Sequence, residues 1–153
     1  MSLLKLAAAD AGDLQILSAR LQDATAKLKN ISWLPQKRRF AMVVNRFRWE
    51  AGANERVRAG LHFDGVLKVQ SHKLKMGAGE AVVALLAIGF APNAGESIDG
   101  EDPGGVVELT FAGGGAIRLT VECIDAGLAD LTQPWAAIGR PDHDKPDHDK
   151  DNV

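Results

Sequence analysis

The first periodic pattern along the chain is helical. From Leu14 onward, leucines recur at the spacing of one helix face, and Asp10 or Asp13 precedes them with a side chain suited to capping a helix. We therefore predict a helix that ends near Asp23, followed by a short strand over residues 24–29.

Alternation of apolar and polar residues then replaces the helical period. Residues 40–49 and 56–64 alternate in this way and flank a loop of turn-forming residues, which predicts a β-hairpin. Pro35 marks a turn that joins a short strand over residues 31–34 to this hairpin. A further strand is expected over residues 65–71.

The second half of the chain repeats the strand pattern. Residues 82–90 are apolar on both faces, as expected of a central strand or a short buried helix. Residues 106–111 and 117–123 alternate on either side of a glycine-rich turn and predict a second hairpin. Residues 124–131 are expected to form one or two helical turns, and residues 91–104 an acidic surface loop or lid.

Together these elements predict an α+β protein. The N-terminal helix packs on a mostly antiparallel sheet of about six to eight strands, which curls into a sandwich or a partly open barrel. A pleckstrin-homology-like barrel is one version of this arrangement. The 153-residue chain is long enough for one domain, which we assign to residues 1–140. Residues 141–153, which repeat Pro-Asp-His-Asp-Lys in tandem, form an acidic tail rich in His and Asp.

Arginines are concentrated in the first predicted hairpin. Because side chains alternate across a strand, Phe47 and Trp49 are expected to point to the core, on the same side as Val57. The opposite face then receives the candidate binding residues, which are Arg46, Arg48, Arg56, Arg58 and His62. A register that pairs Arg48 with Arg56 also sets Arg46 opposite Arg58.

Charge is split between the two halves of the chain. Residues 1–75 carry 14 basic and 6 acidic side chains, whereas residues 76–153 carry 4 basic and 14 acidic ones. Like charges that face each other on a sheet are destabilising, so the arginine face requires anions. Three sources are open: carboxylates of the same chain such as Glu50 and Glu55, an acidic surface on a second copy or another protein, and a nucleic acid.

The function predicted from these features is non-enzymatic binding or assembly through the basic face. Single-stranded nucleic-acid binding is an alternative, but the expected inward direction of Phe47 and Trp49 and an isoelectric point of about 6.1 weigh against it. A second alternative is an enzyme with a site near the loop over residues 91–104, which no catalytic constellation supports. We expect no metal, no cofactor and no membrane partner.

Individual residues add little further chemistry. Cys123 is the one cysteine, which fits a cytoplasmic protein without disulfides, and we expect it to be a buried structural thiol. The apolar stretch over residues 81–92 is shorter than the roughly 20 residues of a membrane span. His143 and His148 can chelate a metal weakly, but they lack the ligand spacing of a structural zinc site.

Four segments carry a resemblance to a known family. They are Leu21-Gln-Asp-Ala24, residues 38–50 (RRFAMVVNRFRWE), residues 111–125 (FAGGGAIRLTVECID) and Arg140-Pro-Asp-His-Asp144. In these segments the chain resembles a proteobacterial domain-of-unknown-function family of small cytoplasmic proteins. The resemblance implies one complete domain and transfers no catalytic residues.

Overall fold

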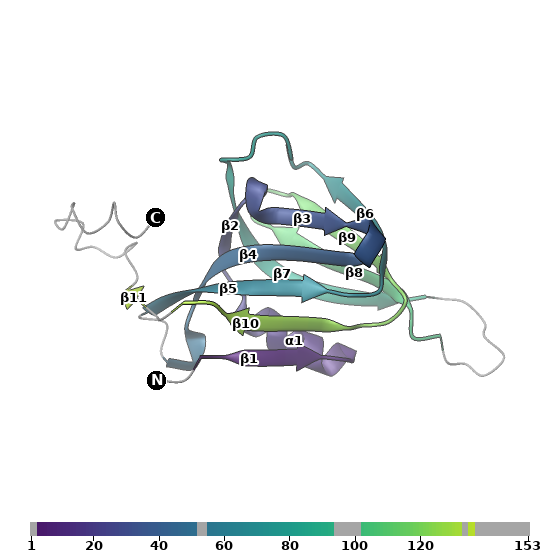
Figure 1. Cartoon of the computed structure of the whole chain (residues 1–153), viewed down its shortest axis with the longest axis horizontal. Coiled ribbons are helices and arrows are strands. Elements are labelled where there is room, and N and C mark those ends of the chain that lie inside the picture. Colours follow the sequence, from purple (N-terminus) through teal and green to yellow (C-terminus); the bar gives the residue numbers. More distant parts are fainter. Residues whose placement is uncertain (1–2, 52–54, 94–101, 133–134, 137–153) are drawn as a thin grey trace.

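A computed structural model describes residues 3–51, 55–93, 102–132 and 135–136 of the chain. Within these residues the fold contains one α-helix, α1 (Ala11–Arg20), and eleven β-strands (Figure 1). The strands are β1 (Lys5–Ala8), β2 (Thr25–Lys27), β3 (Ile31–Leu34), β4 (Arg39–Phe47), β5 (Glu55–Phe63), β6 (Val66–His72), β7 (Val82–Pro92), β8 (Gly105–Phe111), β9 (Ala116–Val121), β10 (Ala126–Asp130) and β11 (Trp135–Ala136). Three short 3₁₀ turns, η1 (Leu28–Asn30), η2 (Pro35–Lys37) and η3 (Trp49–Ala51), connect some of them.

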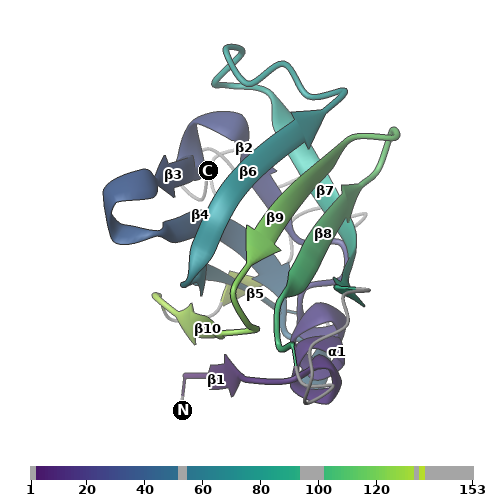
Figure 2. The same ribbon diagram turned by 90° about the vertical axis from the view of Figure 1, so that its right-hand side faces the viewer.

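The helix α1 begins where the sequence predicts a cap. Asp10 is the N-cap residue, and its Oδ1 accepts a hydrogen bond from the Asp13 backbone N–H at 2.7 Å. Leu14 and Leu17 are buried against the sheet, and α1 lies at the bottom of both ribbon views, beside β1 (Figures 1 and 2). The predicted capped helix is confirmed, although it ends at Arg20, earlier than expected. No helix among the described residues has the length and apolar character needed to cross a membrane.

The strands form one continuous, strongly curved antiparallel sheet. Its order is β1-β10-β5-β4-β2-β7-β8-β9-β6, with β3 paired to β4 and β11 paired to β5 at the side of this path. The short strand β2 joins the two halves, because Thr25 pairs with Asn45 of β4 and with Ala84 of β7. Figure 2 shows β6, β9, β8 and β7 running side by side in front of β4 and β5. The predicted α+β fold is confirmed, and the sheet does not close into a barrel.

The hydrophobic core lies between the two halves of the curved sheet. Inward-facing residues from both predicted hairpins meet there, as alternation along the strands requires. Its largest apolar members are Phe40, Met42, Leu61, Phe63, Leu85, Leu109, Phe111 and Ile117, together with Leu14, Leu17 and Leu21 from α1 and the turn that follows it. Burial of this apolar surface is the main stabilising contribution to the fold.

Three strands, β1, β10 and β11, were not expected from the sequence. Residues 124–131 were predicted to be helical, but β10 runs through them and pairs with both β1 and β5. The segment Ala-Gly-Leu-Ala has few β-branched residues, so its local pattern favours a helix and tertiary pairing overrides it. Gly127 has a packing role, because a Cβ there would lie 2.4 Å from Cε1 of the His62 ring on β5.

Candidate arginine–aromatic binding face

The register of the first hairpin differs from the predicted one. Arg46 of β4 pairs with Val57 of β5, and Phe47 pairs with Arg56. Arg46 therefore lies on the inner face of the sheet, while Phe47 lies on the outer face with Arg56 and Arg58. The prediction that Arg46 shares a face with Arg56 and Arg58 is wrong, because β4 buries Phe40, Met42 and Val44 and thereby turns Arg46 inward, where Asp130 pairs with it.

Arg46 is fully buried and all five of its N–H groups are hydrogen bonded. Nε and Nη2 donate to Oδ1 and Oδ2 of Asp130, each at 3.0 Å. Nη1 and Nη2 donate to Oε1 and Oε2 of Glu50 at 3.1 and 2.8 Å, and Nη1 also donates to the Phe47 carbonyl at 3.0 Å. Asp130 Oδ2 additionally accepts the Leu4 backbone N–H at 2.8 Å. This network joins β4, β10 and η3 to Leu4, the residue that precedes β1.

The network keeps Arg46 charged within the protein. Burial by itself lowers the pKa of Arg46, but hydrogen bonds to Glu50 and Asp130 outweigh that effect and raise it above its ordinary value. Hydrogen bonding from Arg46 in turn lowers the pKa of Glu50. Because its donors are all engaged and its side chain is inaccessible, Arg46 has a structural role and is not available to a ligand.

Two further predicted residues also have carboxylates of the same chain beside them. Arg48 forms an ion pair with Glu55 across the hairpin. His62 Nε2 lies 3.6 Å from Asp64 Oδ2, and Asp64 also accepts a hydrogen bond from Arg39 Nε at 2.7 Å, which lowers the pKa of Asp64. Internal carboxylates, one of the three predicted anion sources, therefore supply the partners of Arg46 and Arg48.

Arg56 and Arg58 differ from the other arginines of the hairpin. Among the described residues, neither has a carboxylate within ion-pair distance. The Arg56 guanidinium carbon lies 4.7 Å from the centroid of the Phe47 ring, and Nη2 donates to Thr25 Oγ1 at 3.2 Å. Arg56 Nε is buried and has no hydrogen-bond partner among the described residues. Burial also lowers the pKa of Arg56.

Aromatic side chains extend this surface beyond Arg56. The rings of Phe47 and Trp49 are 5.5 Å apart at an angle of 51°, and Trp49 is 36% exposed. The Trp49 indole N–H donates to the Gln22 carbonyl at 3.0 Å, which fixes the orientation of the ring. Asn45 precedes Phe47 on the same face of β4, since it pairs with Arg58. We define the arginine–aromatic face as Asn45, Phe47, Trp49, Arg56 and Arg58.

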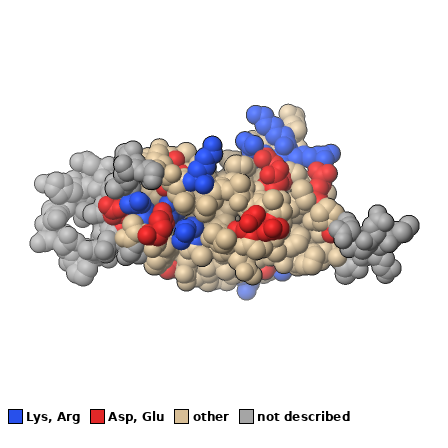
Figure 3. Space-filling model, turned by 90° about the horizontal axis from the view of Figure 1, so that it is seen from below, with Lys and Arg blue, Asp and Glu red and all other residues tan. Residues whose placement is uncertain are grey.

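Elsewhere, several basic residues form ion pairs with nearby carboxylates. Figure 3 shows Lys and Arg in separate small groups, most with Asp or Glu beside them, on the side seen from below. Ion pairs of this kind join Arg38 to Glu122 at 3.0 Å and Lys29 to Glu80 at 2.6 Å. Part of the surplus of basic residues in the first half of the sequence is therefore balanced by Glu80, Glu122 and Asp130, which the fold brings next to them.

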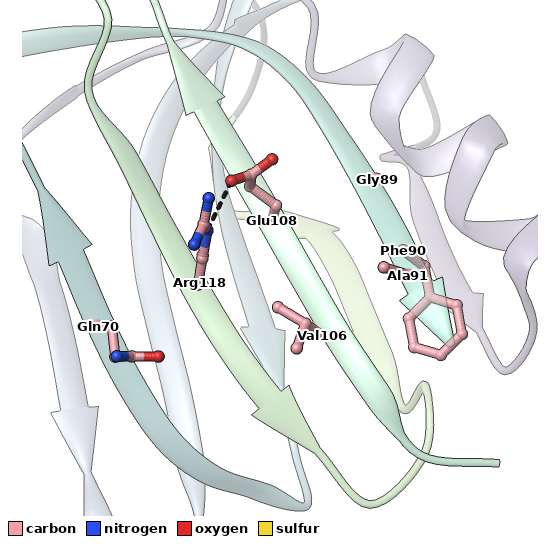
Figure 4. Close-up of a pocket in the computed structure, with 7 residues that line it drawn as sticks. All are labelled: Gln70, Gly89, Phe90, Ala91, Val106, Glu108 and Arg118. Atoms are coloured by element: carbon pink, nitrogen blue, oxygen red, sulfur yellow. Dashed lines mark hydrogen bonds and ion pairs between the residues drawn. The ribbon is translucent and has the colours of Figure 1, made fainter. Parts of the chain in front are cut away.

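A shallow hollow of about 460 Å³ lies on the outer surface of the other half of the sheet. The strand register aligns Gln70, Arg118, Glu108 and Gly89 in one row across it. Arg118 Nε donates to Glu108 Oε2 at 2.8 Å, and this pair crosses the hollow (Figure 4). The two opposite charges are exposed and pair with each other, so neither is an uncompensated charge in the hollow.

The comparison with protein families gives one result. The model of a family described as "Protein of unknown function (DUF2948)" matches residues 4–143. The chain belongs to this family. The match spans every strand from β1 to β11, so the arginine–aromatic face lies within the family domain. This confirms the resemblance to an uncharacterised family. No curated protein and no solved structure matches the chain.

The described residues contain little catalytic chemistry. Cys123 lies just beyond the end of β9 and is partly buried, which corrects the prediction of a fully buried thiol on the strand. No group of three His, Cys, Asp or Glu side chains able to hold a metal occurs in this part of the chain. Most of the predicted acidic loop (residues 94–101) and the histidines of the tail lie outside the described residues.

Proposed function

We propose that the protein is a non-enzymatic binding protein that acts in the cytoplasm and uses the arginine–aromatic face to hold an anionic partner. The observation that carries this proposal is the environment of Arg56. Its guanidinium is half buried over Phe47, and no carboxylate of the described residues pairs with it. A single cysteine is in keeping with a reducing compartment.

The energetic argument rests on what burial costs a cation. A charged group removed from water is destabilising unless an anion or several hydrogen bonds replace its hydration. The Phe47 ring contributes about 0.5–2 kcal/mol through the cation–π contact, which offsets part of this cost. The Nε donor stays unpaired within the described chain, so an incoming anion gains from an arginine that is already oriented.

Self-association is a second candidate, favoured by the split of charge along the sequence. In that arrangement the anion is a carboxylate in the acidic half of a second copy. An interface of this kind weakens as salt screens its charges. Sizing of the protein at low and high salt separates it from binding of another molecule, because self-association alone changes the mass of the purified protein.

Heparin provides a test of anion binding. We expect the wild-type protein to be retained on heparin at low salt, and a double variant with Arg56→Gln and Arg58→Gln to elute at lower salt. The control is Arg118→Gln, which also removes an exposed cation, but one already paired with Glu108. The proposal fails if the wild type is not retained, or if the control and the double variant elute together. Thermal unfolding of each variant checks that the fold is retained.

A further inference from the structure

We propose that the anionic partner of the arginine–aromatic face is single-stranded nucleic acid. This inference rests on the proposed function and names its ligand class. One base stacks on the Phe47–Arg56 pair, while Arg58 contacts the phosphate backbone. Three parts of the surface chemistry favour this ligand: stacking, hydrogen bonding to the polar edge of a base, and the spacing of charge.

Stacking is the first part. Single-strand binding proteins combine cations with aromatic or guanidinium planes that share one sheet face, because every base has a π-face. The observed register provides this combination: Phe47 is beside Arg56 on the outer face, and Trp49 contacts Phe47. The predicted inward direction of both rings, which weighed against nucleic acid, is wrong for Phe47, and Trp49 is 36% exposed.

Hydrogen-bonding capacity is the second part. Two atoms of this face are buried without partners in the described chain, the donor Arg56 Nε and the acceptor Asn45 Oδ1. A carboxylate or a sulfate offers acceptors alone, so it leaves the Asn45 oxygen unsatisfied. The edge of a base carries both donors and acceptors and can satisfy both atoms after small side-chain rotations. This difference favours a base over a simple anion such as a carboxylate or a sulfate.

The placement of charge is the third part. Arg58 follows Arg56 at the next outward position of β5, about 7 Å along the strand. Its backbone is held by hydrogen bonds with Thr132 Oγ1 and the Leu131 N–H, so the strand is fixed while the side chain remains without an ion pair in the described chain. Two cations on one face can contact the phosphates of a flexible nucleic-acid strand. Because only these two cations contact phosphates, binding is expected to weaken with salt with a shallow slope.

The test compares two fluorescent probes by anisotropy at low salt. One probe is a short oligothymidylate, and the other is an abasic oligomer of the same length, which has the same phosphates and no bases. We expect the wild-type protein to bind the oligothymidylate roughly tenfold more tightly, as one stacked base accounts for a difference of that size. Because both measurements use the wild-type protein, the comparison does not depend on any variant folding.

Variants then assign the binding to this face. Phe47→Leu is expected to abolish the preference for the oligothymidylate and to leave binding of the abasic oligomer unchanged. Arg58→Gln is expected to weaken both probes and to reduce the slope of log affinity against log salt by about 1. Arg118→Gln is the matched control and should change neither measurement, because its charge is paired with Glu108.

The outcomes separate this inference from the proposed function. If the wild type binds the two probes with equal affinity, nucleic acid is overturned as the partner. If retention on heparin still depends on Arg56 and Arg58 in that case, the proposal of anion binding stands. A preference for oligothymidylate that persists in Phe47→Leu also overturns the inference, because the bases then stack elsewhere. Absence of binding to both probes and to heparin overturns the two proposals together.

Discussion

Arg46 and Asp130, which are 84 residues apart in the sequence, form a doubly hydrogen-bonded ion pair in the interior of the protein. The Asp130 side chain is 2% exposed and Arg46 is fully buried. Strands β4 and β10 are not neighbours in the sheet, because β5 lies between them. The pair therefore spans β5 on its inner side and fixes the separation of the flanking strands.

Removing the cation from this pair should be strongly destabilising. Arg46→Met leaves the Asp130 carboxylate buried with one backbone donor, and we expect a loss of about 3–5 kcal/mol in the free energy of unfolding. Urea denaturation measures the loss. Arg118→Met serves as the control, since its exposed pair with Glu108 should contribute less than about 1 kcal/mol.

The double variant Arg46→Met/Asp130→Leu distinguishes the ion pair from simple packing. Because it removes both charges, its loss should be smaller than the sum of the two single losses by about 0.5–3 kcal/mol. Additive losses would mean that the two side chains act independently, contrary to the observed geometry.

Acid should weaken this network through Glu50. The hydrogen bond from Arg46 lowers the pKa of Glu50 below its ordinary value of 4.5, so its stabilising contribution is present above that pH. It is lost as the pH falls through the lowered pKa. We expect Glu50→Gln to be less stable than the wild type at neutral pH, with a difference that shrinks below about pH 4.5. Urea denaturation across this range is the measurement, and a difference independent of pH would contradict the prediction.

Two glycines on paired strands provide a matched test of packing. A Cβ at Gly105 would lie 2.3 Å from the Ala91 carbonyl oxygen, whereas a Cβ at Gly89 meets nothing within 4 Å. Gly105→Ala must push β7 and β8 apart, so we expect a loss of about 1–3 kcal/mol. Gly89→Ala should stay within about 0.5 kcal/mol of the wild type. Thermal unfolding compares them, and equal effects would rule out the close approach at Gly105.

Much of the fold follows from local sequence patterns. Both hairpins, the cap at Asp10 and the turn at Pro35 were predicted because each depends on residues close together in the chain. The strands β1 and β10 were missed for the opposite reason. They pair across more than a hundred residues, and neither has a strong strand pattern of its own.

The phase of β4 shows why the site was predicted only in part. Apolar residues occur on both faces of this strand, as Phe40 and Met42 alternate with Ala41 and Val43, so alternation alone does not select the inner face. A polar residue such as Arg46 favours the outward assignment unless its distant partner Asp130 is known. The greater volume of Phe40 and Met42 was the signal that could have identified the inner face.

The central claim is that anions bind at the arginine–aromatic face, and NMR of arginine side chains tests it most directly. The Nε–H of Arg56 is buried at this face, and its resonance is followed while a short heparin oligosaccharide is added. The account predicts that this resonance and those of the Phe47 ring shift in a saturable manner. Shifts confined to arginines outside this face, such as Arg38 or Arg118, would contradict it.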